Sequence, residues 1–484
     1  MTLKQIASLG KKLVVFLALF ADCFGRCDAR ELLRVYVKGL LSDEQRKTAE
    51  GIALRLRKAP RTLQRFLESI KWNEEKLRDR CQEIVARDHA HPDAIGVVDE
   101  SGVAKSGTET VGVGRQYCGN TGKVDNCVVA VHICYAAPGF QCVLDSTVYL
   151  PEDYANDPER RRKNYIPDDV EFLTKPQTAL VQIAHAIENG IHVVAWTFDE
   201  LYGRDGKFLD GLEQLNQTFV AEVPVDFHGW VQKPEILRSG PKNRRGGRKK
   251  KYPRVARRRP SSEVRNLLIY SPVFQEQSWQ RYHIKDTNKG PDVWEVKWSV
   301  LWRKEGERGL PGRRHSLIVA RNVLTQEIKY FVANGVPGEK GVTLRWLLSV
   351  AFRRCVVEQC FREAKEELGM DHYEVRGWRC VHRHYYVAQL SQLFCARVRQ
   401  EYDDPKSPEQ DRLTVEQVRS AMNVWLSAAD TTPAVQKERY EDELKKQRYH
   451  QRRNNQSRKS HTKTKIKRLN ALGIDVNKIK SCVT

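Results

Sequence analysis

The order of apolar segments between residues 91 and 198 constrains the fold of this chain more than any other feature. Three strand-like runs come first, at residues 95–98, 126–135 and 141–149. Pro138 and Gly139, a typical turn pair, lie between the last two runs. Apolar residues at helical spacing follow at 176–188, and Gly190 separates them from an apolar run at 191–198. The pattern predicts an antiparallel three-stranded meander, a helix and a further strand, which is an α/β fold.

Residues 1–90 have the pattern of several short helices. Pro60 fits the first turn of one helix and Asn73 the N-cap of another, and Ser42 begins a capping-box pattern before a third. The stretch 42–70 fits two helices joined by a basic turn, which is compatible with helix-turn-helix DNA binding or with an ordinary bundle that has a basic face. Its cationic residues are Arg55, Arg57, Lys58, Arg61 and Arg65.

The charge balance favours a polyanionic partner. The sequence has 83 Lys and Arg against 61 Asp and Glu, a formal net charge of +22, which fits nucleic acid or an anionic membrane. The apolar run 13–20 imitates a short secretory signal, but no small-residue cleavage site follows it and it is too short to cross a bilayer. We expect a buried helix there. The scattered cysteines form no CxxC pair, which indicates a reducing, intracellular environment.

Residues 205–343 look like an insertion into the α/β region. They contain short strand-like runs, and large apolar residues occupy every second position at Trp294, Val296, Trp298, Val300 and Trp302. The basic run 242–259 also bears Gly and Pro, so we expect a mobile loop there. Helical periodicity resumes at Leu344 and would complete the interrupted core.

Three acidic residues stand where a scaffold is expected to meet solvent. Asp99 follows the run 95–98, Asp199 follows the run 191–198, and Glu358 lies within a predicted helix. Either aspartate alone would more often cap a turn or a helix. Together, three carboxylates could hold two Mg²⁺ or Mn²⁺ ions, which stabilise the attacking and leaving oxygens in phosphoryl transfer. Carboxylates gathered this closely repel one another and need cations between them.

Arg354, Glu358 and Lys365 are spaced by four and then seven residues, which predicts one charged face of a single helix. An alternative is a surface ion pair between Arg354 and Glu358, worth about 0.3–0.5 kcal/mol, with Lys365 solvated. The apolar residues that could hold this helix against a sheet are Val356, Val357, Cys360, Ala364 and Leu368.

A family resemblance gives these residues a shared context. Arg354, Glu358 and Lys365, continued by residues 367–376, resemble the signature around the third carboxylate of bacterial insertion-sequence DDE transposases. The segment is most similar to the branch with a Tyr-Arg-Glu-Lys motif and a β-rich insertion before the glutamate. The regions of that family's first and second aspartates are resembled by residues 97–102, 115–119 and 122–126, and by residues 199–203.

By that resemblance, Asp99, Asp199 and Glu358 would be the catalytic metal ligands, and Arg354 and Lys365 would bind phosphates at the transposon end. The family's tyrosine position is occupied by Ala351, followed by Phe352, so the contribution of that tyrosine is absent or comes from another residue. Further DNA contacts are expected from Lys123, Arg376, Arg248, Lys249 and Lys250.

The resemblance also implies an α/β, RNase H-like core (β-β-β-α-β-α) interrupted by a β-rich insertion, after an N-terminal helical domain. The implied function is a DNA transposase that cuts transposon ends and joins them to target duplex DNA in a cut-and-paste reaction. It would act as a homodimer in the DNA synapse with two Mg²⁺ or Mn²⁺ ions, in the cytoplasm at the nucleoid and away from membranes. The expected parts are residues 1–90 (helical, DNA-binding), 91–204 (core, first part), 205–343 (insertion), 344–401 (core, second part) and 402–484 (basic, partly disordered, with weak order expected at 445–468).

Three alternatives remain open: a nuclease of the same fold that cuts without joining, a catalytically inactive transposase-derived DNA-binding protein, and a membrane-associated protein that uses residues 11–21. One of the three alternating Trp residues could stack on an unpaired base at the cleaved end, although such alternation is typical of a packed strand face. His382 and His384 could be metal ligands, but structural roles or phosphate contacts fit them better, because Mg²⁺ prefers oxygen donors.

Overall fold

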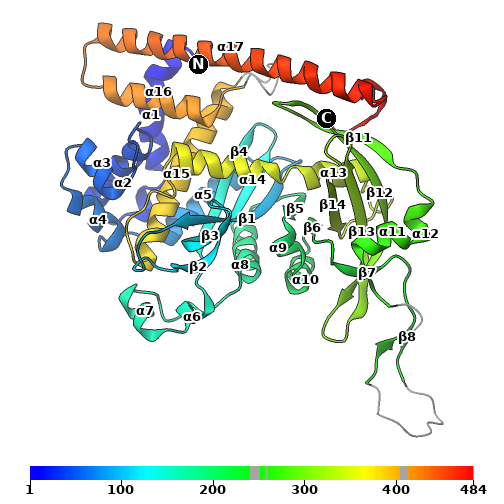
Figure 1. Cartoon of the computed structure of the whole chain (residues 1–484). Helices are drawn as coiled ribbons and strands as arrows, with labels where there is room; N and C mark the ends of the chain where they lie inside the picture. Colours follow the sequence, from blue (N-terminus) through cyan, green and yellow to red (C-terminus); the bar gives the residue numbers. More distant parts are fainter. Residues whose placement is uncertain (240–250, 257–259, 404–411, 483–484) are drawn as a thin grey trace. The chain divides into compact units, whose positions relative to one another are not determined.

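The computed structural model describes residues 1–239, 251–256, 260–403 and 412–482 (Figure 1). The chain forms two compact units, each made of two separate stretches of sequence. Unit 1 comprises Met1–Val194 and Cys355–Gln456, and unit 2 comprises Ala195–Arg354 and Ser457–Thr484. Their elements confirm an α/β fold. Arg248, Lys249 and Lys250, with most of the run 242–259, lie outside the described residues.

Unit 1 begins with a helix that buries its apolar face. α1 (Leu3–Ala18) starts at Thr2, whose side chain takes part in a capping box. Its buried residues include Leu13 and Phe16, as expected for a buried helix at 13–20. Gly10 is required on this face because a Cβ there would overlap the ring of Trp425. No helix within the described ranges is both long and apolar enough to cross a membrane.

Further short helices complete the N-terminal region, as predicted. Pro60 opens the fourth helix and Asn73 caps the fifth. The capping box predicted at Ser42 is wrong, because its hydroxyl donates to the carbonyl of Gly39 and Thr48 caps the third helix instead. The elements are a 3-10 turn (Ala21–Cys23), α2 (Cys27–Leu40), α3 (Ala49–Arg55), α4 (Pro60–Glu68) and α5 (Glu74–Asp88).

The sheet of unit 1 contains the predicted meander with one additional strand, β2. Its strands are β1 (Ile95–Ala104), β2 (Gly114–Cys118), β3 (Lys123–Ala137) and β4 (Phe140–Val148). β3 pairs antiparallel with each of the other three. Gly139, in the turn between β3 and β4, has φ +75, a conformation that side chains disfavour. The sequence pattern predicts that the first strand ends at Val98, and this boundary is wrong. The pairing of β1 with β3 continues to Ala104, so Asp99 lies in the middle of a strand.

Helices from both stretches of unit 1 contact this sheet. α8 (Lys175–Glu188), predicted at 176–188, contacts β3 and β4. α14 (Cys355–Arg362) contacts β1, β3 and β4, and α15 (Trp378–Tyr402) contacts β4. The remaining helices of unit 1 are α6 (Glu152–Ala155), α7 (Pro158–Lys163), α16 (Val415–Ala428) and the first part of α17 (Pro433–Ala471).

α15 is the central helix of unit 1, and most of its residues are buried. It contacts α2, α4, α5 and α16 as well as the sheet. Arg383 on this helix is 2% exposed, and its guanidinium satisfies the carbonyls at the end of α4. The groups that accept its hydrogen bonds are the carbonyls of Phe66, Leu67, Ile70 and Trp72 and the carboxylate of Glu74.

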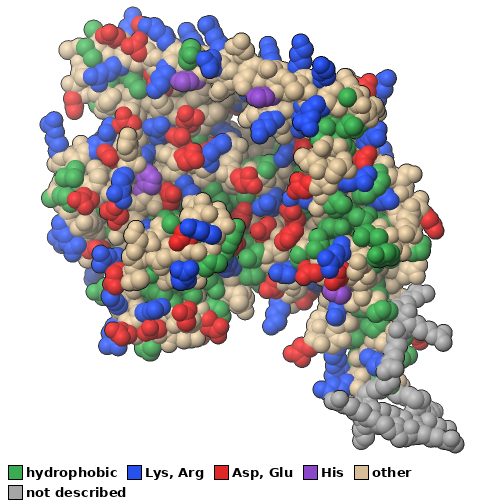
Figure 2. All heavy atoms as spheres, in the orientation of Figure 1, with side chains coloured by type: hydrophobic (Ala, Val, Ile, Leu, Met, Phe, Trp, Pro, Cys, Tyr) green, Lys and Arg blue, Asp and Glu red, His purple; other side chains and the backbone are tan. Residues whose placement is uncertain are grey.

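Residues 445–468, for which weak order is expected in the absence of nucleic acid, form part of α17. The helix has no Gly or Pro between Pro433 and Gly473, so nothing in its sequence interrupts it. Leu444 is buried in unit 1 and Leu469 in unit 2, which gives each part of the helix an anchor. Between these leucines there is no acidic residue, and Figure 2 shows Lys and Arg side chains standing out along the helix.

Unit 2 contains a mixed sheet. β5 (Ala195–Phe198) pairs in parallel with β6 (Phe219–Val223), and the order β6-β14-β13-β12-β11 continues with antiparallel pairs. These strands are β14 (Ile328–Ala333), β13 (Leu310–Asn322), β12 (Gly290–Glu305) and β11 (Gln280–Thr287). The helices are α9 (Glu200–Gly203), α10 (Gly206–Gln214), α11 (Val264–Tyr270), α12 (Pro272–Gln275) and α13 (Leu344–Phe352). Short pieces are β7 (His228–Trp230), β8 (Ile236–Leu237), β9 (Arg254–Val255), β10 (Ser262–Glu263), a 3-10 turn (Val476–Lys478) and β15 (Lys480–Ser481).

Trp294, Trp298 and Trp302 lie on β12, as the period of two in this segment predicts. Trp294 is 4% exposed, and its ring lies 4.8 Å from that of Phe352, centroid to centroid. Trp298 and Trp302 are partly exposed. Trp294 is therefore part of the packed interior of unit 2.

Candidate active site

Asp99 lies on the face of the unit 1 sheet that α14 covers. In the antiparallel register Asp99 stands opposite His132 of β3, and directly opposed residues point to the same face. The ring of His132 lies edge-on to Phe361 of α14, with centroids 4.9 Å apart. The carboxylate of Asp99 and the helix that carries Glu358 are thus on one side of the sheet.

His132 is a fixed neutral group beside Asp99. Its ring nitrogens form hydrogen bonds with the hydroxyls of Ser101 (2.8 Å) and Ser146 (2.6 Å). Burial, together with the positive charge of Lys365, lowers the pKa of His132 to about 3. Because both nitrogens of this neutral imidazole form hydrogen bonds, His132 has a structural role. The oxygen donors on this face of the sheet are therefore the carboxylates.

Glu358 stands in the first turn of α14 and is exposed. Val357 and Cys360 on the same helix are fully buried, and the thiol of Cys360 forms a hydrogen bond with that of Cys134 on β3. Glu358 is three residues before Phe361, so the two share a helix face, and Phe361 touches the ring opposite Asp99. Of the apolar positions predicted to hold this helix against a sheet, Val357 and Cys360 are therefore buried within α14, whereas Val356 is partly exposed.

The predicted single charged helix face is wrong. α13 ends at Phe352, a turn follows at Arg353 and Arg354, and α14 begins at Cys355. Arg354 therefore precedes the helix of Glu358, and it belongs to unit 2. Its Nε lies 3.7 Å from a carboxylate oxygen of Glu222, a buried residue of β6. The helix breaks where the chain passes from one unit to the other, although no Gly or Pro marks the position.

Lys365 lies in a π-helical turn (Glu363–Glu367) that follows α14. Such turns are frequent at functional sites. Its ammonium donates to the side-chain carbonyl of Asn120 at 3.2 Å. Burial lowers the pKa of Lys365, while the carboxylates of Asp371 and Asp99 act in the opposite direction. The ammonium is therefore within electrostatic reach of Asp99, inside unit 1.

Asp199 directly follows β5 in unit 2, as predicted. One carboxylate oxygen accepts a hydrogen bond from the backbone N–H of Leu201 at 3.0 Å and so caps α9. Burial raises the pKa of the neighbouring Glu200, and the charges of Glu222 and Asp199 raise it further. Asp199 is thus part of a group of carboxylates in unit 2.

Glu222 is a member of this group that sequence reasoning missed. It is 9% exposed, and one of its carboxylate oxygens lies 2.6 Å from the ammonium of Lys329 on β14. The other oxygen faces Arg354. The available signal was a single charged residue in a strand whose other residues, Phe219, Val220, Ala221 and Val223, are all apolar.

The carboxylates have the donor chemistry that Mg²⁺ and Mn²⁺ require, because both ions prefer oxygen ligands. Glu358 is exposed and Asp99 partly so, which leaves their oxygens accessible to a hydrated ion. Within the described residues of either unit, no three His, Cys, Asp or Glu side chains lie close enough to hold an ion. Asp99 and Glu358 belong to unit 1, and Asp199 belongs to unit 2.

His382 and His384 have structural roles, as the sequence analysis favoured. His384 accepts from the hydroxyl of Tyr36 and donates to the carbonyl of Gly369. His382 donates to the carbonyl of Trp378. Both rings are buried, and burial lowers the pKa of each to about 4. Neutral, fully engaged rings of this kind are not available to phosphate or metal.

Two further predicted DNA-contact residues, Lys123 and Arg376, lie in unit 1. Lys123 is exposed at the start of β3, with its ammonium 3.9 Å from the carboxylate of Asp125. Arg376 is exposed, and its carbonyl accepts from the backbone N–H of Val111. Ala351, at the position of the missing tyrosine, is buried in α13.

The sequence matches the family described as DDE superfamily endonuclease over residues 19–291. The chain belongs to this family. Enzymes of the DDE superfamily generally use divalent metal ions and act on DNA, which agrees with the acidic residues and the basic surface described above. The matched residues of this DDE-family chain include Asp99 and Asp199, whereas Glu358 lies beyond them.

A similar protein is the "Probable transposase for insertion sequence element IS701" of Microchaete diplosiphon. It is 32% identical over 187 residues, which is 38% of this chain and 46% of the relative. The alignment therefore spans less than half the length of the relative.

Proposed function

We propose that this DDE-family chain is a DNA transposase that cuts the ends of an insertion sequence and joins them to target DNA. The observation that carries the proposal is the packing of α14, with Glu358, on the sheet face that bears Asp99. The family match and the named transposase relative add independent support. Cut-and-paste transposition fits a chain whose site combines acidic groups with nearby cations.

The proposed catalytic residues are Asp99, Asp199 and Glu358, which would together hold two Mg²⁺ or Mn²⁺ ions. Ions held there would supply charge stabilisation to the attacking and leaving oxygens during phosphoryl transfer. The chain's own residues set the rest of the chemistry. Lys365, beside Asp99, would bind a phosphate oxygen next to the reacting bond, and Arg354, held by Glu222, would bind another.

The wider arrangement follows from this proposal. An RNase H-like core with a β-rich insertion would hold the carboxylates. Helices α3 and α4 contact each other and are joined by residues 56–59, which suits recognition of duplex ends. Lys123, Arg376, Arg248, Lys249 and Lys250 would contact the backbone. Joining two ends in concert would require two copies of the chain in a synapse, at the bacterial nucleoid.

Cleavage of DNA that carries the inverted repeats flanking the reading frame tests the proposal. The wild-type chain is compared with Asp99→Asn, Asp199→Asn and Glu358→Gln at concentrations that give equal DNA binding. Asp153→Asn, an exposed carboxylate of unit 1, is the matched control. Each active-site variant is expected to lose about a hundredfold or more in cleavage rate with Mg²⁺ or Mn²⁺, because it removes a charge needed by the ions.

The products separate the alternatives. Joined strands longer than any substrate strand support a transposase, whereas cleavage without joining indicates a nuclease of the same fold. Binding of the ends without any cleavage would indicate an inactive descendant. Normal cleavage by any one variant would show that its carboxylate is not a metal ligand.

A further inference from the structure

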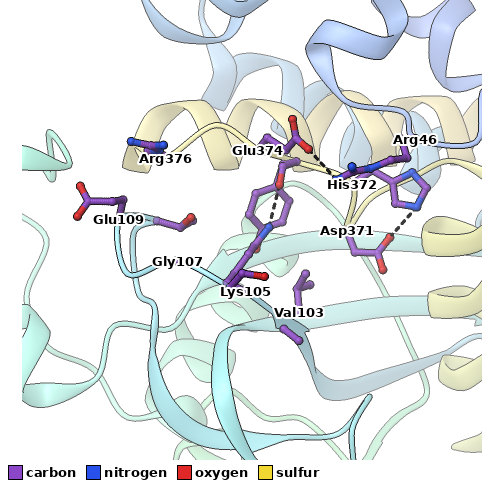
Figure 3. Close-up of a pocket in the computed structure, with 13 residues that line it drawn as sticks. Arg46, Val103, Lys105, Gly107, Glu109, Asp371, His372, Glu374 and Arg376 are labelled. Carbon is purple, nitrogen blue, oxygen red and sulfur yellow. Dashed lines mark hydrogen bonds and ion pairs between the residues drawn. The ribbon is translucent and has the colours of Figure 1, made fainter.

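Unit 1 contains a cavity of about 420 Å³ that the proposed carboxylate site does not use (Figure 3). Its walls come from three stretches: the loop that follows β1, the segment that follows the π-helical turn, and Arg46 from the connection between α2 and α3. The charged side chains in its lining are Arg46, Lys105, Glu109, Asp371, Glu374 and Arg376.

Hydrogen bonds hold these walls in place. The ammonium of Lys105 donates to the carbonyl of Tyr373 at 2.8 Å, and the backbone N–H of Val111 donates to the carbonyl of Arg376 at 2.8 Å. The side-chain amide of Asn126 donates to the carbonyls of Lys105 (2.6 Å) and Gly107 (3.0 Å). The loop is thus tied at both ends, so a ligand would meet a preformed cavity.

The acidic residues of the lining are offset by cations. Glu109 pairs with Lys163 at 2.6 Å, and Glu374 pairs with Arg46 at 2.7 Å. Asp371 acts on both Lys105 and Lys365. The lining itself holds three cations (Arg46, Lys105 and Arg376) and three acids, and Lys163, which pairs with Glu109 from outside the lining, leaves one positive charge in surplus. The surplus favours an anion.

The character of the walls suits a phosphate better than a base. The ammonium of Lys105 lies 3.7 Å from the centroid of the Tyr373 ring and covers it, so that face is closed to stacking. Gly107 has no atom within 4 Å of the place of a Cβ, so a ligand can approach its backbone closely. Burial lowers the pKa of Lys105 to about 8, which leaves the ammonium form predominant at neutral pH.

The cavity is linked to Asp99 through β1. Lys105 is six residues after Asp99, which corresponds to roughly 20 Å along an extended strand. Asp371 lines the cavity and also acts on Lys365, which in turn lies within reach of Asp99. Successive phosphates of one strand rise by about 3.4 Å along the duplex axis and also turn around it, so an interval of this size separates phosphates that lie several base pairs apart.

We propose that this cavity binds a backbone phosphate of the DNA, several base pairs from the phosphate that is cut. The inference rests on the proposed function, because it requires the scissile phosphate to lie at Asp99. Lys105 and Arg376 are the principal ligands, with the backbone at Gly107 alongside. The cavity therefore fixes the register of the DNA strand relative to the carboxylates.

The test combines charge removal in the protein with charge removal in the DNA. Duplexes that carry the element's own end are made with one methylphosphonate at a time, at each of the ten phosphates on either side of the cut. Their affinities are measured without divalent ions for the wild type, Lys105→Met, Arg376→Gln and Lys4→Met. Lys4 is an exposed lysine of α1 and serves as the matched control for the lost charge.

Lys105→Met and Arg376→Gln are each expected to weaken binding of unmodified DNA about tenfold. One methylphosphonate, several positions from the cut, should weaken the wild type similarly yet have no further effect on either variant. Arg376 keeps the test valid if Lys105→Met folds poorly, because its side chain is exposed. Lys4→Met should show additive losses at every position.

Additive losses for Lys105→Met and Arg376→Gln at every phosphate would overturn the proposal. So would tight binding of inorganic phosphate that Lys105→Met abolishes while DNA affinity stays unchanged, since the ligand would then be a free anion. If the wild type fails to bind or cut its own ends at all, the proposed function itself is wrong. If the wild type cleaves its own ends normally but both variants show additive losses at every phosphate, only the proposal for the cavity is rejected.

Discussion

At the scale of single residues, the least expected feature is a carboxylate buried in unit 2. Glu222 lies in an otherwise apolar strand and is flanked by two cations, Lys329 and Arg354. Removing one charged side chain from such a buried group leaves the charges of the others unpaired. Glu222 is therefore both a stability determinant and the residue that orients Arg354.

Glu222→Gln is expected to lower the free energy of unfolding by about 1–3 kcal/mol, because two partly buried cations lose their carboxylate. Urea denaturation measures this change. Glu327→Gln is the matched control: Glu327 also approaches Lys329, at 3.8 Å, but is mostly exposed. Its effect should stay within about 0.5 kcal/mol, and equal losses for both variants would refute the role of Glu222.

The sequence located the acidic residues better than their surroundings. Asp199 follows a strand and Glu358 lies on a helix, as their apolar neighbours predict. Asp99 lies inside β1 because the ladder with β3 extends past Val98, and a ladder depends on a partner distant in sequence. Arg354 leaves the helix because α13 packs in unit 2 and α14 in unit 1. Neither the length of β1 nor the helix break at Arg354 is indicated by the neighbouring residues in the sequence.

At the scale of elements, α15 carries two buried histidines whose pKa values burial lowers to about 4, and it contacts the β4 strand of the sheet that holds His132. In the unfolded chain a histidine titrates near pH 6.5. Between about pH 6.5 and 4 the unfolded chain therefore binds more protons than the folded one. Stability contributed by these neutral rings is present above this window and is lost as pH falls through it.

Urea denaturation at pH 7.5, 6 and 5 checks this expectation. The free energy of unfolding should fall by roughly 1–3 kcal/mol per buried histidine across the window. His382→Gln and His384→Gln should each make the pH dependence shallower, whatever their stability at neutral pH. His461→Gln, on the exposed surface of α17, should leave the slope unchanged. Identical slopes for all variants would contradict the assignment.

Helix and strand types were predictable from local pattern, and their boundaries less so. Pro60 and Asn73 begin helices because their side chains suit the first turn whatever surrounds them. Ser42 fails as a cap because the carbonyl of Gly39 takes its hydroxyl. The extent of α17 also escaped prediction, since its ends pack through Leu444 and Leu469, which are buried in units formed by other segments.

At the scale of the whole molecule, the net charge of +22 should dominate DNA binding. Counterion release makes the logarithm of affinity fall linearly with that of salt. A chain that binds about six to ten phosphates should lose about 10³–10⁵-fold in affinity between 50 and 200 mM salt. Filter binding across this range measures the slope, and a flat response would exclude phosphate binding by the basic segments.

The basic part of α17 is expected to bind some of these phosphates. Replacing Lys459 and Lys463, which lie one turn apart on its exposed surface, by Gln should reduce the slope by about 0.9 for each phosphate that is no longer neutralised. Replacing Lys4 and Lys11 of α1, which are equally exposed, removes the same charge. An equal change of slope in both double variants would show that only net charge matters.

The discontinuity of unit 1 has a consequence for synthesis of the chain. Asp99 leaves the ribosome long before Glu358, because Ala195–Arg354 is translated between the two stretches of the unit. The central helix α15 is translated later still. A nascent chain, or a fragment from an interrupted message, would carry most of the family-matched sequence without the glutamate or the helix that completes the core. On the proposed assignment of Glu358 as a metal ligand, cutting would be withheld until that glutamate has been translated.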